Sequence, residues 1–196
     1  SVFIVTIAFL STASKPAYCD PTYNDFQTWL QVNSYLSLDT GKKFQLFMEA
    51  QPRFGDDSSR LERLILRPAM VYNIDPSLSV FVGYAWAPLY MNSRYEHDFR
   101  SEQRSWEQIL YTQKLENTNF TFQHRLRQEQ RFIADAGEMA NRTRYLLKAS
   151  HPFVSGGTTG LTAFNEYFVN WNTVQNGPKR GFDRDRVFFG PYLTSG

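Results

Sequence analysis

Alternation of apolar and polar side chains along successive extended segments is the feature that most restricts the fold of this chain. In residues 43–54 the apolar side chains step by two positions: Phe44, Leu46, Met48 and Ala50. Polar residues such as Gln45 and Glu49 occupy the positions between them. Side chains of a strand point alternately to opposite faces, so a period of two predicts strands with one apolar and one polar face. The sequence therefore predicts an all-β fold.

Length and composition fit one domain of this kind. The chain has 196 residues, enough for one full barrel and too few for two comfortable cores. It contains 17 Phe and 11 Tyr, yet its mean hydropathy is −0.46, so large apolar rings and polar groups share the same segments. The formal net charge of +2 gives no indication of nucleic-acid binding.

The alternating pattern divides into nine predicted strands separated by polar turns. They cover residues 26–38, 43–54, 61–74, 78–88, 104–115, 120–132, 142–151, 161–171 and 184–193. Short connections such as 39–42 and 75–77 contain Asp with Gly or Pro, which favour tight hairpins. We predict an antiparallel up-and-down β-barrel. Pro68 lies within one strand and cannot donate a ladder hydrogen bond, so we expect a bulge or a locally open pairing there.

The first 19 residues differ from the rest. The apolar run Val2–Leu10 is too short to span a bilayer and is followed by small residues and Ala17-Tyr18-Cys19. We predict that residues 1–19 are a secretory signal peptide truncated at its N-terminus, and that residues 20–196 are the barrel domain. A first strand or helix is the alternative. Cleavage after Cys19 would remove the single cysteine and exclude disulfides and thiolate metal sites.

The content of the polar face favours a membrane barrel over a soluble one. A soluble lipocalin-like barrel has an apolar interior, whereas a membrane barrel turns its apolar face to lipid. Here the polar face is rich in Arg with few Lys, and Arg with Glu can form paired ladders across a narrow lumen. The candidate lumen charge network is Glu49, Arg53, Arg63, Arg67, Arg125, Arg127, Glu129, Arg131, Arg142, Arg144, Glu166 and Arg186.

Two further expectations follow if the apolar face of each strand contacts lipid and the charged face lines the lumen. Five residues should point outward to lipid: Leu46, Met48, Val80, Val82 and Tyr84. Aromatic residues near strand ends fit girdles at the two membrane interfaces: Trp29, Phe54, Tyr72, Trp86, Tyr167 and Trp171. One feature opposes this interpretation. Counting from Phe26, the first connection is short and the even-numbered connections are long, the reverse of a bacterial barrel that begins in the periplasm.

Several strand segments together resemble a bacterial family, the domain of unknown function 2490 (DUF2490). They are Trp29-Leu-Gln, Arg63-Leu-Ile-Leu-Arg67-Pro, Val82-Gly-Tyr84, Arg104-Ser-Trp-Glu-Gln108, His124 to Phe132, Phe164-Asn-Glu-Tyr-Phe168 and Arg186-Val-Phe-Phe-Gly190. The resemblance implies a Gram-negative outer-membrane barrel with no assigned activity. It also implies a further strand after Tyr192-Leu193, hence a fragment of a barrel with about ten to twelve strands.

Catalytic motifs are weak. The three histidines, His97, His124 and His151, have no metal-ligand spacing, and the sequence has no glycine-rich phosphate loop. His124 on the apolar face with Ser105 nearby would resemble an outer-membrane lipid hydrolase, and Asp98 beside His97 a protease. We predict no enzymatic activity, no metal and no cofactor.

The predicted function is a structural or small-solute transport component of the cell outer membrane. Its partner is outer-membrane lipid, with no nucleic acid and with no solute specified by the sequence. The alternatives are an outer-membrane enzyme acting on lipid and a soluble lipocalin-like barrel that binds a ligand.

Overall fold

The computed structural model describes residues 2–11, 26–90, 99–116 and 118–193. Twelve strands make up its regular structure: β1 (Val2–Ser11), β2 (Phe26–Ser37), β3 (Phe44–Gly55), β4 (Arg60–Asn73), β5 (Leu78–Trp86), β6 (Leu89–Tyr90), β7 (Phe99–Arg100), β8 (Glu102–Lys114), β9 (Thr121–Ile133), β10 (Ala140–Pro152), β11 (Thr159–Asn170) and β12 (Gly181–Leu193). Within these ranges, no helix has the length and apolar character needed to cross a membrane.

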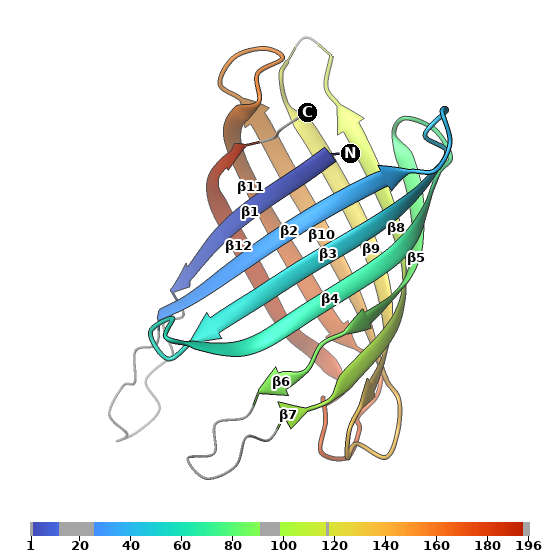
Figure 1. Cartoon of the computed structure of the whole chain (residues 1–196), viewed down its shortest axis with the longest axis vertical. Helices are drawn as coiled ribbons and strands as arrows, with labels where there is room; N and C mark the ends of the chain where they lie inside the picture. The colour runs from blue at the N-terminus through green and yellow to red at the C-terminus, as the bar shows by residue number, and fades with distance from the viewer. Residues whose placement is uncertain (1, 12–25, 91–98, 117, 194–196) are drawn as a thin grey trace.

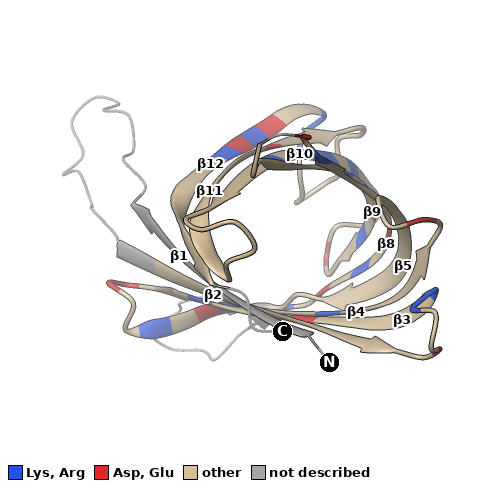
Figure 2. Cartoon of the chain, turned by 90° about the horizontal axis from the view of Figure 1, so that it is seen from above, with Lys and Arg blue, Asp and Glu red and all other residues tan. Residues whose placement is uncertain are grey.

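The long strands form one antiparallel up-and-down sheet in the order β1-β2-β3-β4-β5-β8-β9-β10-β11-β12 (Figure 1). The two-residue strands β6 and β7 pair with each other, and β6 also pairs with β4. Seen from above, the sheet curls into an incompletely closed barrel (Figure 2). The edge strands β1 and β12 lie near each other, but no ladder joins them in the described ranges. The predicted fold class is confirmed, and its nine strands correspond to β2–β5 and β8–β12.

Strand β1 adds a tenth long strand before Phe26. It pairs with β2 from Val2 opposite Tyr35 to Ser11 opposite Phe26. The signal-peptide assignment of residues 1–19 stays a prediction, since pairing within this chain does not test cleavage during export. Counting from β1 instead of β2 shifts the numbering of the connections by one, so the short turns now follow the even-numbered long strands. The turns 38–43, 74–77, 115–120 and 153–158 now share one end of the barrel, and the connections β5–β8 and β11–β12 lie at the other.

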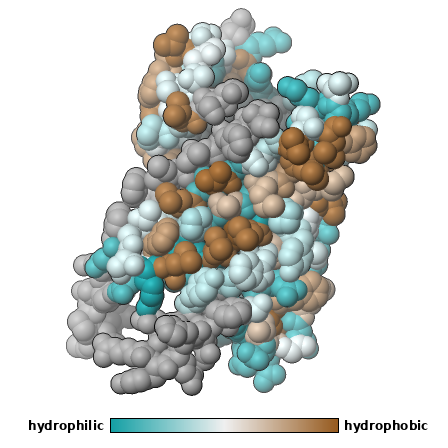
Figure 3. Space-filling model, viewed as in Figure 1, coloured by the Kyte–Doolittle hydropathy of each residue, from teal (hydrophilic) through white to brown (hydrophobic). Residues whose placement is uncertain are grey.

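Alternation fixes which side chains face outward. In β5, Val82 is 63% exposed on the outer wall, whereas its neighbours Phe81 and Ala85 are buried on the inner side. Four of the five residues expected to face outward are exposed, namely Leu46, Met48, Val82 and Tyr84, and Val80 is half-buried. Figure 3 shows apolar side chains spread over the middle of the outer wall. The same face of other strands exposes Leu36, Met70, Ile109, Leu126, Tyr145, Tyr167 and Val187.

Part of the interior is apolar, which the alternation of the sequence did not predict. A buried cluster of inward side chains joins β3, β4, β5 and β8: Phe47, Ala69, Val71, Phe81, Ala85 and Trp106. Phe47 contacts the rings of Phe81 and Trp106 edge-on, with centroids 5.8 and 6.5 Å away. Gly83 makes room for Trp106, because a Cβ at this position would lie 2.7 Å from its ring.

The pairing around Pro68 is open, as expected. Pro68 lies opposite Met48 in the β3–β4 ladder. On the other side, the β4–β5 pairing passes from Leu66 opposite Trp86 to Ala69 opposite Gly83, so the ladder skips Pro68. The opening of the β4–β5 ladder thus includes Pro68, which has no N–H to donate to it.

Candidate functional site: the charged lumen

The charged side chains of the inner wall come from alternate positions of neighbouring strands. In β9, Arg125, Arg127, Glu129 and Arg131 are two residues apart, so all four point to the same face. Arg142 and Arg144 repeat this spacing in β10. Antiparallel pairing places Glu129 opposite Arg142 and opposite Trp106 on the other side. Local alternation and register together concentrate the charges inside the barrel.

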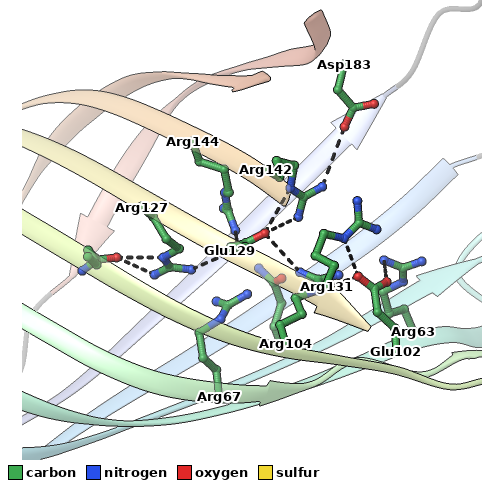
Figure 4. A network of polar contacts seen from close by, with 12 residues as sticks. Arg63, Arg67, Glu102, Arg104, Arg127, Glu129, Arg131, Arg142, Arg144 and Asp183 are labelled. Atoms are coloured by element: carbon green, nitrogen blue, oxygen red, sulfur yellow. Dashed lines mark hydrogen bonds and ion pairs between the residues drawn. The ribbon is translucent and has the colours of Figure 1, made fainter. Parts of the chain in front are cut away.

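Glu129 is the centre of the largest ion-pair cluster (Figure 4). Its side chain is fully buried, with 0% exposure. Arg142 donates to Glu129 Oε2 through Nε at 3.0 Å and Nη2 at 2.5 Å, and Arg144 Nη1 donates to Oε1 at 2.8 Å. Nη1 of Arg104 lies 3.8 Å from Oε2, and Nη1 of Arg127 lies 4.0 Å from Oε1. One carboxylate thus compensates charge from three strands.

Glu166 of β11 is a second centre, joined to the first by Arg144. Nε and Nη2 of Arg144 donate to Glu166 Oε1 at 2.9 and 2.6 Å. Arg125 Nη2 donates to the same oxygen at 2.6 Å, and Arg186 Nη1 lies 3.9 Å from Oε2. Since Arg144 also binds Glu129, the network runs without a break from β8 to β12.

Glu102, at the start of β8, holds a third cluster near one mouth of the barrel. Nε of Arg104 and Nε of Arg131 donate to Glu102 Oε1 at 2.8 and 2.6 Å. Arg63 Nη1 is 4.0 Å from Oε2. Glu102 and Arg104 are not among the predicted network residues. The predicted strand begins at Arg104, although Glu102 has the same alternation as Arg104 and Gln108, and this alternation is the signal that would identify it.

Glu49 and Arg67 form a separate buried pair. They lie opposite each other in the β3–β4 ladder, and Arg67 Nη1 donates to Glu49 Oε1 in a hydrogen-bonded ion pair. Both side chains are almost completely buried. This pair lies on strands that carry the inner apolar cluster, so its charges are enclosed by protein rather than by water.

Arg127 is the least compensated of the buried charges. Its Nε and Nη2 donate to Gln108 Oε1 at 2.9 and 2.6 Å, and its guanidinium lies 4.4 Å from the Trp106 ring centroid. A cation over an aromatic face recovers part of the cost of burial. Nη1 of Arg127 and Nε of Arg67 and Arg125 have no hydrogen-bond partner in the described part of the chain. The inner wall therefore has more positive charge than its carboxylates neutralise.

Trp29 faces the lumen, so its assignment to an interfacial girdle is wrong. The guanidinium carbons of Arg53 and Arg186 lie 4.0 and 4.9 Å from its ring centroid. Arg53 also donates from Nε and Nη2 to Gln51 Oε1. Alternation in β2 explains this, because Trp29 has the inward parity of Tyr35 while Leu36 faces outward. The outward aromatic residues Tyr72, Tyr167 and Trp171 are exposed.

The structure brings all twelve residues of the candidate network into ion pairs or cation–aromatic contacts. They occupy strands β3, β4, β9, β10, β11 and β12, and their partners include Glu102, Arg104 and Asp183, which were not in the predicted set. Arg184 differs from its neighbour Arg186, because its side chain is 56% exposed and pairs with Asp183 at 3.2 Å. The functional role of the network stays a prediction.

The weak catalytic candidates are not brought together. His124 faces outward, where its Nδ1 is hydrogen-bonded to the Tyr145 hydroxyl at 2.8 Å. Ser105 donates to Gln130 at 2.9 Å. In the β8–β9 register His124 lies opposite Tyr111, six residues along β8 from Ser105, which corresponds to about 20 Å. His97 and Asp98 lie outside the described residues. Among the residues that are described, no three His, Cys, Asp or Glu side chains could hold a metal.

Comparison with known proteins gives a family without an activity. An uncharacterized protein of Methylorubrum extorquens is 28% identical over 197 residues, which cover 100% of this chain and 82% of that protein. No solved structure matches the chain. The family described as "Protein of unknown function (DUF2490)" matches residues 26–192. The family suggested by the strand segments is thereby confirmed, and the chain belongs to the DUF2490 family.

Proposed function

We propose that this protein is a structural β-barrel of the outer membrane whose lumen is closed by its own charged network. The inverted distribution of side chains is the observation that carries the proposal. Arg127 and Glu129 are buried inside the barrel, whereas Val82, Val187 and Phe189 are more than 60% exposed on its outer wall. A soluble barrel would bury the apolar face and expose the charges. Lipid is the solvent that makes the observed arrangement favourable.

The lengths of the connections also support a place in the outer membrane. Bacterial barrels have short periplasmic turns and longer extracellular loops. The turns 38–43, 74–77, 115–120 and 153–158 share one end, where β1 begins and β12 ends. The other end has the two long connections, β5–β8 and β11–β12, together with the short connections 56–59 and 134–139. In the proposed orientation the end where β1 begins faces the periplasm. The mouth around Glu102, near the β5–β8 and β11–β12 connections, then faces the outside of the cell.

The packing of the lumen favours a closed barrel over an open pore. Trp106, Arg127 and Glu129 are at most 2% exposed, so side chains occupy the middle of the interior. A barrel of about ten strands is only modestly wider than one that side chains fill completely. A small-solute transport role is the second candidate. It is favoured by the excess of arginine, because a water-filled lumen of this charge would select anions.

The proposal assigns the barrel no catalytic step and no cofactor. An outer-membrane hydrolase needs a nucleophile and a base within hydrogen-bond reach. Ser105 and His124 are separated by about half the height of the β8–β9 ladder. A soluble lipocalin-like role would require water against the exposed apolar wall, and contiguous surfaces of this kind promote aggregation.

Reconstitution into planar bilayers tests the proposal and its second candidate together. The protein is expected to insert spontaneously from detergent and to give no large, steady conductance, because the network fills the lumen. An open porin is the positive control for the recording. Large and steady anion-selective currents would replace the structural role by transport. Failure of correctly refolded protein to insert into any bilayer would contradict the membrane location.

A further inference from the structure

A basic cavity lies at the mouth that contains Glu102. It has a volume of about 260 Å³ and lies between the start of β8, the end of β9 and the connection from β11 to β12. Its charged lining consists of Arg63, Arg100, Arg131, Arg184, Glu102 and Asp183. Four of these residues, Arg63, Arg131, Glu102 and Asp183, also belong to the outermost part of the lumen network, as Figure 4 shows. Arg100 and Arg184 are not members of the predicted network.

The two carboxylates of the cavity cannot neutralise its four arginines. Both also interact with arginines of the lumen: Glu102 accepts a hydrogen bond from Arg104 at 2.8 Å, and Asp183 lies 3.7 Å from Arg142. Among the described residues, Arg63, Arg131 and Arg104 thus share Glu102, Arg184 and Arg142 share Asp183, and Arg100 has no carboxylate partner. The cavity keeps a local excess of positive charge, and its protein walls focus the resulting potential.

The guanidinium groups of the cavity also have donors to spare. Arg131 uses Nε for Glu102, while its Nη1 and Nη2 donate to no group in the described ranges. Arg63 approaches Glu102 no closer than 4.0 Å. Arg100 is held in place by the carbonyls of Ala134 and Asn176, to which it donates at 3.0 and 2.5 Å. Guanidinium forks of this kind bind tetrahedral oxyanions in a bidentate manner.

We propose that this cavity is a binding site for an oxyanion of the phosphate class. Arg63, Arg131 and Arg184 supply the donors, and Arg100 fixes the loop that closes one side. The ligand has the chemistry of a phosphate monoester, carried either by a dissolved solute or by a lipid headgroup. This inference goes beyond the proposed function, because occupancy of the mouth requires neither a membrane nor a closed lumen.

Isothermal titration of the full chain, refolded in nonionic micelles, with inorganic phosphate tests the site. Saturable binding with one phosphate per barrel is expected at fixed ionic strength. Because each substitution removes a charged hydrogen-bond donor, the double variant R63Q/R184Q should bind phosphate at least about tenfold more weakly. The matched control is K114Q, which removes one charge at a second cavity lined by Pro76, Tyr111 and Lys114. Its dissociation constant should stay within about twofold.

A second variant, expected to raise the affinity for phosphate, keeps the test valid if the double variant misfolds. D183N removes a competing carboxylate from the cavity and should tighten phosphate binding. Absence of saturable heat, or an equal weakening in K114Q, would overturn the site.

Competition by a phosphorylated glycolipid added to the micelles would identify a lipid headgroup as the ligand. Binding of phosphate without such competition would identify a dissolved oxyanion. Bilayer insertion and conductance are separate readouts, so failure of the site leaves the proposed function standing.

Discussion

Replacing Glu129 with glutamine is expected to lower the free energy of unfolding of the barrel by about 3–5 kcal/mol. Glu129 is completely buried and accepts hydrogen bonds from Arg142 and Arg144. Glutamine keeps the size of the side chain but removes the charge, so these guanidinium groups would remain buried with less compensation. Unfolding by urea in phospholipid vesicles, followed by the fluorescence of the four tryptophans, measures the change.

The matched control for this prediction is E116Q. Glu116 is exposed in the turn between β8 and β9, where the same chemical change removes a charge in contact with solvent. It should alter the free energy of unfolding by less than about 0.5 kcal/mol. Equal effects of E129Q and E116Q would show that the buried network does not stabilise the barrel.

The second large effect is expected on the outer wall. Val82→Arg should destabilise the vesicle-embedded barrel by about 2–4 kcal/mol, because it places a guanidinium near the middle of the lipid layer. Val82 lies in the middle of β5 and is 63% exposed. On a wall in contact with water, the same substitution at such an exposed position would cost almost nothing. The midpoint of refolding in urea, measured in vesicles, gives the value.

Val154→Arg is the control for the outer wall. Val154 is 71% exposed in the turn between β10 and β11, beyond the strands and so beyond the proposed apolar band. The substitution is identical, but its cost should fall to about 0–1 kcal/mol near the interface. If Val82→Arg costs no more than Val154→Arg, the outer wall does not face lipid.

Much of the fold was predictable because alternation is a local property of the sequence. A period of two fixes both the presence of a strand and the face on which each side chain lies. The strand limits were less accurate. Glu102 lies outside the predicted strand 104–115, although it starts β8 and binds Arg104 and Arg131. The apolar run Val2–Leu10 fits a leader and a strand equally well, and composition alone cannot distinguish them.

The partners within the lumen were not predictable, since they depend on register between strands. Arg144 bridges Glu129 and Glu166 only because β9, β10 and β11 align these positions. The inner cluster of Phe47, Phe81 and Trp106 was missed for a related reason. Phe47 lies between two outward apolar residues, so the alternation of the strand turns it inward although its side chain is as apolar as theirs. The same rule applied to Trp29 would have placed it inside.

Spin labels placed singly along residues 78–86 of β5 test the lipid-facing wall most directly. Cys19→Ser removes the single natural cysteine, and each labelled variant is reconstituted in vesicles. For a membrane barrel, we predict that collisions with dissolved oxygen peak at Val80, Val82 and Tyr84 and fall at the positions between them. Collisions with a water-soluble nickel complex should stay low at these outward positions. Peaks of the nickel signal there would place water on the apolar wall and contradict the membrane barrel.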